Sequence, residues 1–220
     1  MTAQHLIAHD IPALDVNQTG RDAYHLLSDY HVKHLPVVDG RRLVGIISEE
    51  DVFNHKLYEP VSDYDFTTVR RFSVRSDEHL FDIIRIMGEN RLTVIPVVDS
   101  EDNYLGMVSQ NMLLRTFANS VSFAEPGAVL VLEMTRRDYS LALIARLVEE
   151  EDAKLLTSII TTSEDPEMME VAIKINRSDL SRITASLERQ GFVVKESFGV
   201  DAYTDGMKER YDSFLAYMNV

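Results

Sequence analysis

The sequence contains no cysteine, and its apolar runs are short. The lack of cysteine excludes disulfides, thiolate nucleophiles and thiolate metal ligands. It is typical of a reducing compartment, so we expect a cytoplasmic location. No run approaches the roughly 18 consecutive apolar residues of a membrane helix, so no membrane span is expected. Residues 1–10 have no basic segment followed by an apolar one, which predicts no secretory signal.

Basic residues are few relative to acidic ones. The chain has 22 Lys and Arg against 36 Asp and Glu, for a formal net charge of −14. Such a surface repels nucleic acid and anionic lipid, and no Lys- or Arg-rich segment offers a local exception. Neither nucleic acid nor membrane is therefore expected as a partner, and the acidity is most simply explained by solubility.

Common catalytic motifs are also missing. The chain has no Gly-x-Ser-x-Gly elbow, no phosphate-binding P-loop and no glycine-rich dinucleotide fingerprint. His5 and His9 have the four-residue spacing of helical metal ligands, but their segment lacks a third ligand. With no nucleophile, base and metal in combination, the sequence predicts neither an enzyme nor a metal site.

The chain does contain an internal repeat. Residues 35–39 read Leu-Pro-Val-Val-Asp, and sixty residues later residues 95–99 read Ile-Pro-Val-Val-Asp. Each is followed by a Gly–apolar–apolar–Ser block, at residues 45–48 and 106–109. A repeat at fixed spacing indicates two copies of one supersecondary unit. The copies differ three residues after the serine, where the first has Asp51 and the second Met112.

Each copy is predicted to follow the order β-α-β-β-α. Thr19 is a candidate helix N-cap in the first copy, and Ser76 or Asp77 in the second. Apolar residues at helical spacing predict the first helix of each copy. In the first copy, elements are expected at residues 12–16, 20–31, 32–39, 43–48 and 49–57. In the second copy, they are expected at residues 72–74, 80–87, 92–99, 104–109 and 110–118.

This pattern resembles the CBS-domain family, whose members occur as tandem pairs. The resemblance rests on the Pro-Val-Val-Asp strand, the turn and the Gly-x-x-Ser-x-x-Asp block, and it implies CBS units at residues 1–60 and 61–120. In this family a pair often binds an adenosine-containing ligand, of the AMP, ADP or ATP type, between its sheets. The serine of the block contacts phosphate, the aspartate takes the ribose hydroxyls, and backbone near the strand meets adenine.

Carried over to this chain, the resemblance implies a first site at Ser48 and Asp51. Around the base it places Ile11, Pro12, His34, Leu35 and Pro36. The chemistry agrees, because an ionised carboxylate accepts the two hydrogen bonds that a ribose diol offers. Free N–H groups at the helix start would support a phosphate beside Ser48. The alternative is structural: Ser48 caps the following helix and Asp51 is a surface residue.

The second copy offers a weaker site at Ile95, Pro96 and Ser109. Met112 takes the place of the aspartate, and a thioether cannot accept the ribose hydrogen bonds at useful strength. We therefore expect this site to be weak, differently selective or empty.

A different domain follows a predicted linker at residues 121–126. Strands are predicted at residues 128–134, 154–162, 169–175 and 192–198, and helices at 138–151 and 178–190. Ser178 is the candidate cap of the second helix, and Gly191 lies where its C-cap belongs. The order βαββαβ is the ferredoxin-like arrangement, which makes the whole chain α+β. A last helix is expected at 207–218, in a C-terminal segment 204–220.

The domain at residues 127–203 resembles ACT-type regulatory domains. Those that bind amino acids usually carry a glycine between the first strand and the first helix, whereas residues 135–140 contain none and Pro126-Gly127 precede the strand. The resemblance therefore implies dimerisation through the sheet. A CBS pair followed by an ACT-like domain is also similar in architecture to the bacterial acetoin-utilisation accessory proteins.

These observations predict a non-enzymatic sensor. Nucleotide binding to the CBS pair would shift the third domain or an unknown regulated partner protein, because the ligand binds one arrangement better than another. The expected assembly is a homodimer with two CBS pairs packed as a disc. The alternative is a structural adaptor or dimerisation protein whose CBS sites are vestigial.

Overall fold

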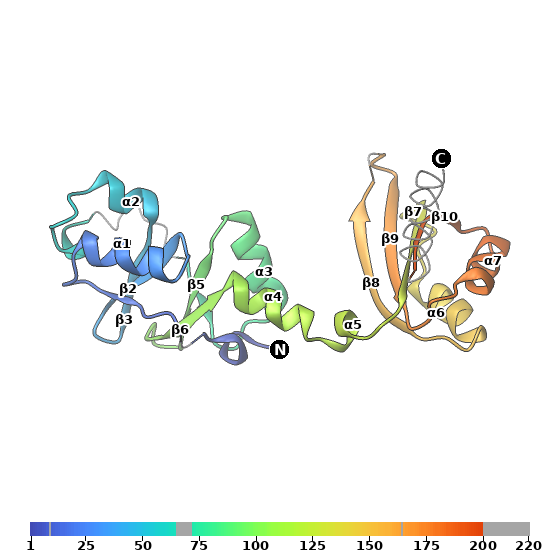
Figure 1. The fold of residues 1–220 in the computed structure, drawn as a ribbon, viewed down its shortest axis with the longest axis horizontal. Helices are drawn as coiled ribbons and strands as arrows, with labels where there is room; N and C mark the ends of the chain where they lie inside the picture. The colour runs from blue at the N-terminus through green and yellow to red at the C-terminus, as the bar shows by residue number, and fades with distance from the viewer. Residues whose placement is uncertain (9, 65–71, 164, 200–220) are drawn as a thin grey trace, which may run out of the picture. The chain divides into compact units, whose positions relative to one another are not determined.

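The computed structural model describes residues 1–8, 10–64, 72–163 and 165–199 (Figure 1). The chain divides into two compact units, Met1–Phe117 and Ala118–Val220. Each unit has its own hydrophobic clusters, so each is described by itself.

The first unit contains the repeat, and both copies have the predicted β-α-β-β-α order. The first copy consists of β1 Leu14–Asp15, α1 Gly20–Asp29, β2 His34–Asp39, β3 Arg42–Ser48 and α2 Glu49–Asn54. The second consists of β4 Val74–Arg75, α3 Leu80–Glu89, β5 Val94–Val98, β6 Tyr104–Ser109 and α4 Gln110–Ala118. Each copy forms a three-stranded sheet in which a short parallel strand precedes an antiparallel pair.

The two antiparallel pairs share a bulge at the same position. The register shifts between Val37 and Val38 in the first copy and between Val97 and Val98 in the second. The glycine of each block lies opposite the residue before the bulge. Gly106 has φ +151°, and a Cβ atom there would lie 2.3 Å from Cγ2 of Ile7. The repeated glycine therefore has a packing reason in the second copy.

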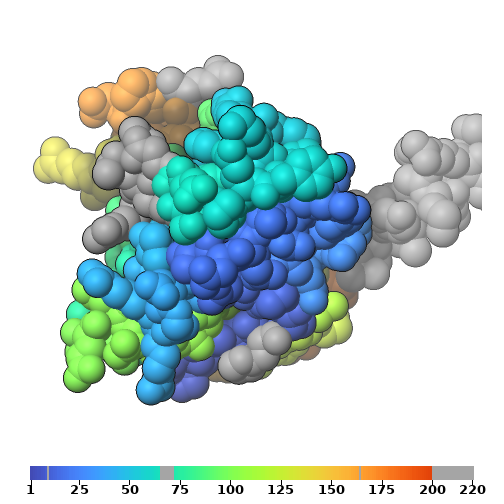
Figure 2. All heavy atoms as spheres, turned by 90° about the vertical axis from the view of Figure 1, so that its left-hand side faces the viewer, coloured from blue at the N-terminus to red at the C-terminus, as the bar shows by residue number. Residues whose placement is uncertain are grey.

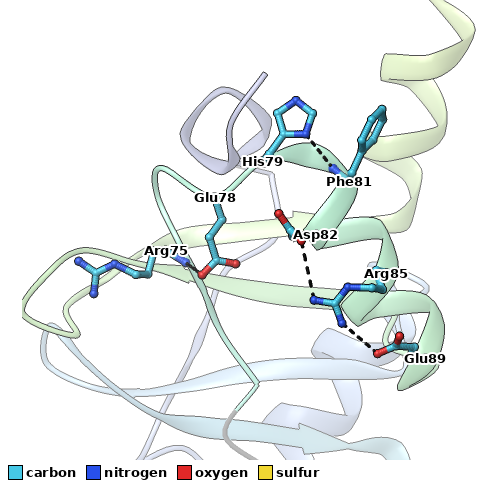
Figure 3. A network of polar contacts seen from close by, with 7 residues as sticks. All are labelled: Arg75, Glu78, His79, Phe81, Asp82, Arg85 and Glu89. Atoms are coloured by element: carbon cyan, nitrogen blue, oxygen red, sulfur yellow. Dashed lines mark hydrogen bonds and ion pairs between the residues drawn. The ribbon is translucent and has the colours of Figure 1, made fainter.

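Helix ends match the predictions in part. Thr19 caps α1, as predicted, and forms a capping box with Asp22. The prediction of Ser76 or Asp77 as the cap of α3 is wrong: His79 is the N-cap, and its Nδ1 accepts a hydrogen bond from the N–H of Phe81 at 3.3 Å (Figure 3). Imidazole is an uncommon cap, so sequence preferences favoured the serine and aspartate instead.

The exposed face of α3 carries a small ion-pair series. Arg85 lies 3.8 Å from Asp82 and 3.3 Å from Glu89, one on each side along the helix (Figure 3). Such exposed pairs stabilise a helix by only about 0.2–0.5 kcal/mol each. These pairs therefore add little to the stability of the fold.

The hydrophobic core of each copy includes a 3₁₀ helix that comes just before the other copy in the sequence. The 3₁₀ helix η1, Ala3–Leu6, buries Ala3 and Leu6 in the cluster of the second copy. The 3₁₀ helix η2, Val61–Asp63, precedes the second copy but buries Val61 in the cluster of the first. The backbone bonds correspond too, from Gln4 N–H to Ser76 and from Ser62 N–H to Val16. Each copy therefore contains core residues from outside its own β-α-β-β-α segment, although the repeat in the sequence consists of two separate segments.

The second unit has the predicted βαββαβ order. Its elements are β7 Ala128–Thr135, α6 Leu141–Glu150, β8 Leu155–Thr162, β9 Met168–Ile175, α7 Ser181–Arg189 and β10 Val193–Phe198. The four strands form one antiparallel sheet in the order β10-β7-β9-β8. Alternate residues of β7 and β9 are buried against α6 and α7, which leaves the other face of the sheet without these helices (Figure 1).

Three details of the second unit differ from the predictions or extend them. Ser178 does not cap α7, because the helix begins after Leu180. The predicted linker contains a short helix, α5 Val121–Ala124, in which the Ser122 hydroxyl donates to the Leu156 carbonyl at 3.0 Å. Gly127 lets β7 approach β9, since a Cβ atom there would lie 2.1 Å from the Ile175 carbonyl oxygen. The helix predicted at 207–218 lies outside the described residues.

Candidate functional site

The junction between β3 and α2 holds the two residues with the strongest sequence signal. Ser48 is the last residue of β3 and the N-cap of α2, and Asp51 is the third residue of that helix. Asp51 Oδ2 accepts the Ser48 N–H at 2.7 Å and the Ser48 hydroxyl at 2.7 Å, and Ser48 Oγ accepts the Asp51 N–H at 3.1 Å. The first part of the structural alternative is therefore confirmed, because Ser48 caps α2, whereas Asp51 is its partly buried capping-box partner and not simply a surface residue.

The capping box does not use both carboxylate oxygens of Asp51. Both bonds from Ser48 end on Oδ2 of Asp51, and Oδ1 has no hydrogen-bond partner among the described residues. Both side chains are partly exposed. A carboxylate oxygen with free lone pairs at a half-exposed strand end can accept hydroxyl donors from a ligand.

The helix start is less available than predicted. The N–H of Glu49 donates to the Lys33 carbonyl at 2.9 Å, and that of Asp51 donates to Ser48. Glu49, Glu50 and Asp51 also place three acidic side chains in the first turn. The expectation that free helix-start amides support a phosphate is therefore wrong for residues 49 and 51.

His34 lies beside this junction. It is the first residue of β2, and its partner across the antiparallel pair is Ser48. Its Nδ1 accepts the N–H of Thr93 at 3.2 Å and lies 3.1 Å from Thr93 Oγ1. Burial lowers the pKa of His34, the nearby Asp51 carboxylate partly opposes this, and Lys33 lowers the pKa further. The ring is therefore neutral at neutral pH and bound to the second copy.

The remaining predicted residues divide by burial. Leu35 and Pro36 are buried and lie opposite Ile47 and Ile46, so their side chains belong to the core. Ile11 packs partly buried against the first-copy cluster, whereas Pro12 is exposed. The structure thus brings Ser48, Asp51 and His34 together, and it leaves only main-chain atoms of Leu35 and Pro36 for a ligand.

The second copy has the same backbone and a different chemistry. Ser109 is 6% exposed, and its Oγ accepts the N–H of Met112 at 3.2 Å. The Gln110 N–H donates to the Thr93 carbonyl at 3.0 Å, as Glu49 does to Lys33 in the first copy. Ile95 and Pro96 are buried. No carboxylate completes this cap, so the junction offers no ribose acceptor in place of Asp51.

Sequence reasoning missed three residues near Asp51 and His34. Thr93 carried no motif signal, yet its hydroxyl also accepts the Lys33 N–H at 2.9 Å. His55 lies 2.8 Å from the Asp51 carbonyl oxygen through Nδ1, and its ring stacks on Tyr64 with centroids 4.1 Å apart. The Tyr64 hydroxyl is buried without a partner among the described residues, and burial, with Glu59 and Asp51, raises its pKa. Only tertiary contacts reveal these residues, because none lies in a recognisable pattern.

A small cavity lies at the opposite end of β3. Its volume is about 110 Å³, and it is lined by Arg42, Leu43, Val44, Ser73, Val98 and Asp102. Ligand pockets typically have about 300–1,000 Å³, so this cavity is too small for a nucleotide. Within the described part of the chain, no group of three or more His, Asp or Glu residues is arranged to hold a metal. No helix among those residues is long and apolar enough to cross a membrane.

Comparison with family models gives two matches, which lie in the first unit except for the last two residues of the second match. The model of the CBS domain matches residues 3–58 and again residues 61–119. Together the matches cover just over half of the chain, and each includes one copy of the repeat.

Similar proteins match about half of the chain. An uncharacterized protein of Methanocaldococcus jannaschii is 25% identical over 111 residues, which are 48% of this chain and 36% of that protein. A homoserine O-acetyltransferase of Methanobrevibacter ruminantium is 30% identical over 114 residues, 49% of this chain and 22% of the enzyme. The matched region thus spans well under half of these relatives.

Solved structures include a CBS domain pair/ACT domain protein of Thermotoga maritima. It is 23% identical to this chain, with a TM-score of 0.47, over 53% of this chain and 96% of that one.

Proposed function

This chain belongs to the CBS-domain family, whose model matches just over half of it, and we propose that it is a non-enzymatic regulatory protein that binds an adenosine nucleotide in its first copy. The observation that carries the proposal is the open Oδ1 of Asp51 beside Ser48. A ribose presents two adjacent hydroxyl donors, and an ionised carboxylate is an acceptor with two oxygens. The Asp51 carboxylate is therefore already the acceptor group that a ribose diol needs at this junction.

The proposed ligand is a nucleotide with one main site per chain. Asp51 accepts the ribose hydroxyls, the Ser48 hydroxyl turns from Asp51 toward a phosphate, and the base lies near His34 and the backbone of Leu35 and Pro36. Met112 removes the ribose acceptor from the second copy, so the site at Ile95, Pro96 and Ser109 is the weaker one. The three acidic residues in the first turn of α2 favour ligands of low phosphate charge.

We further propose that the chain acts as a homodimer. In the first copy Tyr24 of α1 and Phe53 of α2 form an exposed aromatic pair with centroids 5.7 Å apart. The segments that contain α1 (blue) and α2 (cyan) lie side by side on the face drawn in Figure 2. The corresponding helices of the second copy expose Phe81 and Leu114, each 69%. Exposed apolar side chains repeated on both helix pairs support packing of two CBS pairs against one another.

The ACT-like unit supports the same assembly. Its edge strand β8 carries no charged residue and exposes Ile159 and Ile160. The opposite edge, β10, carries Lys195 and Glu196, and both edge strands have a register shift. Charged side chains on an edge strand oppose pairing, so β8, which has none, is the edge suited to a second copy.

A structural adaptor is the second candidate. The observation that favours it is the capping box itself, because Thr19 and Asp22 form the same box in α1, where no ligand site is proposed. An adaptor with vestigial CBS sites would need Ser48 and Asp51 only to begin a helix.

A thermal-shift screen separates the two candidates. AMP, ADP, ATP, NAD and S-adenosylmethionine are each titrated to millimolar concentration against the full chain. A ligand that binds only the folded state raises the melting temperature progressively with its concentration. We expect such a rise with at least one of the five compounds. No response to any of them supports the adaptor.

A further inference from the structure

His34 connects the proposed first-copy site to the second copy through one ring nitrogen. The Thr93 N–H points at Nδ1 of His34 from 3.2 Å, and Thr93 Oγ1 lies 3.1 Å from the same atom. Oγ1 already accepts the Lys33 N–H at 2.9 Å, which leaves its own proton free to point at the ring. Nδ1 therefore faces one fixed donor, the Thr93 N–H, and a hydroxyl that can also donate to it.

A ring nitrogen that accepts hydrogen bonds carries no proton. In a neutral imidazole one nitrogen is the donor and the other the acceptor, so the proton of His34 lies on Nε2. Burial keeps the pKa of His34 low, in agreement with a neutral ring. The Thr93 backbone thus sets the tautomer, as hydrogen bonds to one ring nitrogen commonly do.

The free side of the ring belongs to the proposed site. His34 lies opposite Ser48 in the β2–β3 pair, and Asp51 is close enough to influence its protonation. Nε2 has no hydrogen-bond partner among the residues that the structure describes. The ring is partly exposed, so this N–H is available to a ligand bound at Ser48 and Asp51.

We propose that His34 reads the base of the bound nucleotide by donating its Nε2–H to an acceptor nitrogen of the purine, with Thr93 as the residue that fixes the ring. This inference rests on the proposed nucleotide site. Adenine offers only acceptors at its ring nitrogens, whereas guanine has a donor at N1. The second copy has Val94 at the position of His34, opposite Ser109, so it has no such donor.

The tautomer is tested without a ligand. Two-bond ¹H–¹⁵N correlation spectra of the full chain distinguish a protonated Nδ1 from a protonated Nε2. We expect His34 to carry its proton on Nε2 at neutral pH, and to keep it there in Thr93→Val, which retains the backbone donor. A proton on Nδ1, or on both nitrogens, overturns the proposal.

Base reading is tested with altered purines. Binding of AMP and ATP, and of the 1-deaza, 3-deaza and 7-deaza forms of each, is measured by calorimetry on wild type, His34→Phe and His34→Gln. We expect one deaza form to bind wild type about three- to tenfold more weakly, the value of one hydrogen bond. The same form should show no penalty in His34→Phe and a partial one in His34→Gln, whose amide is a donor.

The two possible failures are distinguishable. If wild type binds AMP or ATP but the deaza penalties are equal in wild type and His34→Phe, base reading by His34 is wrong and the nucleotide site stands. If wild type binds neither nucleotide, both proposals are wrong. Circular dichroism of each variant identifies loss of folding, and the spectra of wild type remain a separate test of the tautomer.

Discussion

Asp51 holds Ser48 through a single carboxylate oxygen, Oδ2, which accepts both the N–H and the hydroxyl of that serine at 2.7 Å. The other oxygen, Oδ1, has no hydrogen-bond partner among the described residues. In the second copy the corresponding pair is Ser109 and Met112, joined only by the bond from the Met112 N–H to Ser109 Oγ at 3.2 Å. The difference between the copies therefore concerns one acceptor group on a shared backbone.

Restoring that group should restore the second site. In Met112→Asp the new carboxylate can accept the Ser109 N–H and complete a capping box, which should stabilise the fold by about 0.5–1 kcal/mol. Calorimetry with the nucleotide that wild type binds should then give two equivalents per chain in place of one. Met112→Asn is the matched control without charge. A stoichiometry that stays at one in Met112→Asp contradicts the assignment of ribose binding to this position.

The glycine of the repeated block should be needed for stability in the second copy. Gly106→Ala places a methyl group 2.3 Å from Cγ2 of Ile7, at a φ of +151°. We expect a loss of about 1–3 kcal/mol in the free energy of unfolding, measured by urea denaturation. The control is Gly88→Ala in α3, where no atom lies within 4 Å. This change should raise stability by about 0.5–1 kcal/mol, and a loss in both variants would refute the packing argument.

Acid should weaken the first unit through His34. Its pKa is lowered in the folded state, chiefly by burial, from an ordinary value of about 6.5. The folded state then binds fewer protons, so the contribution of His34 is complete above about pH 6.5 and is lost as the pH falls through the folded pKa. His34→Gln should therefore flatten the fall in the free energy of unfolding below pH 6.5, measured by urea denaturation across that range. If the free energy of unfolding falls equally steeply with pH in wild type and His34→Gln, the His34 ring does not cause the loss of stability in acid.

The free edge of the second unit should control assembly. Ile159→Lys places a charge on β8, where wild type is 44% exposed at this residue and the strand has no charge. Because a lysine on an edge opposes strand pairing, the variant should shift the sedimentation equilibrium toward monomer. Val193→Lys on β10 is the control, since that edge is already charged. A dimer unaffected by Ile159→Lys, or lost equally in Val193→Lys, contradicts pairing through β8.

Much of the fold could be predicted because its signals are local. The repeated Pro-Val-Val-Asp strand, the glycine turn and the apolar spacing of the helices give the β-α-β-β-α order, and the alternation in β9 gives a half-buried strand. Thr19 and Gly191 are typical end signals, and both lie at the ends of their helices. The exchange of Ala3–Leu6 and Val61–Asp63 between the copies could not be predicted, since a swapped segment has the same sequence pattern as an unswapped one.

The residues of the candidate site could be predicted from the sequence better than the arrangement of their side chains. Motif spacing identifies Ser48 and Asp51, but it cannot tell which carboxylate oxygen the cap uses. Leu35 and Pro36 belong to the motif because they build the core strand, so their side chains are unavailable to a ligand. Thr93 and Tyr64 reach the neighbourhood of Asp51 and His34 from segments far along the chain, and no local pattern indicates them.

The central claim is that Asp51 binds the ribose and does more than cap a helix. Asp51→Ala removes the carboxylate half of the capping box together with the ribose acceptor. Asp22→Ala removes the same half of the matching box with Thr19 in α1 and leaves the site intact. The two variants should therefore lose similar stability, about 0.5–2 kcal/mol each.

The most direct test is calorimetric titration of wild type, Asp51→Ala and Asp22→Ala with the adenosine nucleotide that stabilises wild type. The account predicts that Asp22→Ala binds as wild type does, and that Asp51→Ala binds at least tenfold more weakly because two charge-assisted hydrogen bonds are lost. Equal binding by Asp51→Ala and Asp22→Ala would contradict it.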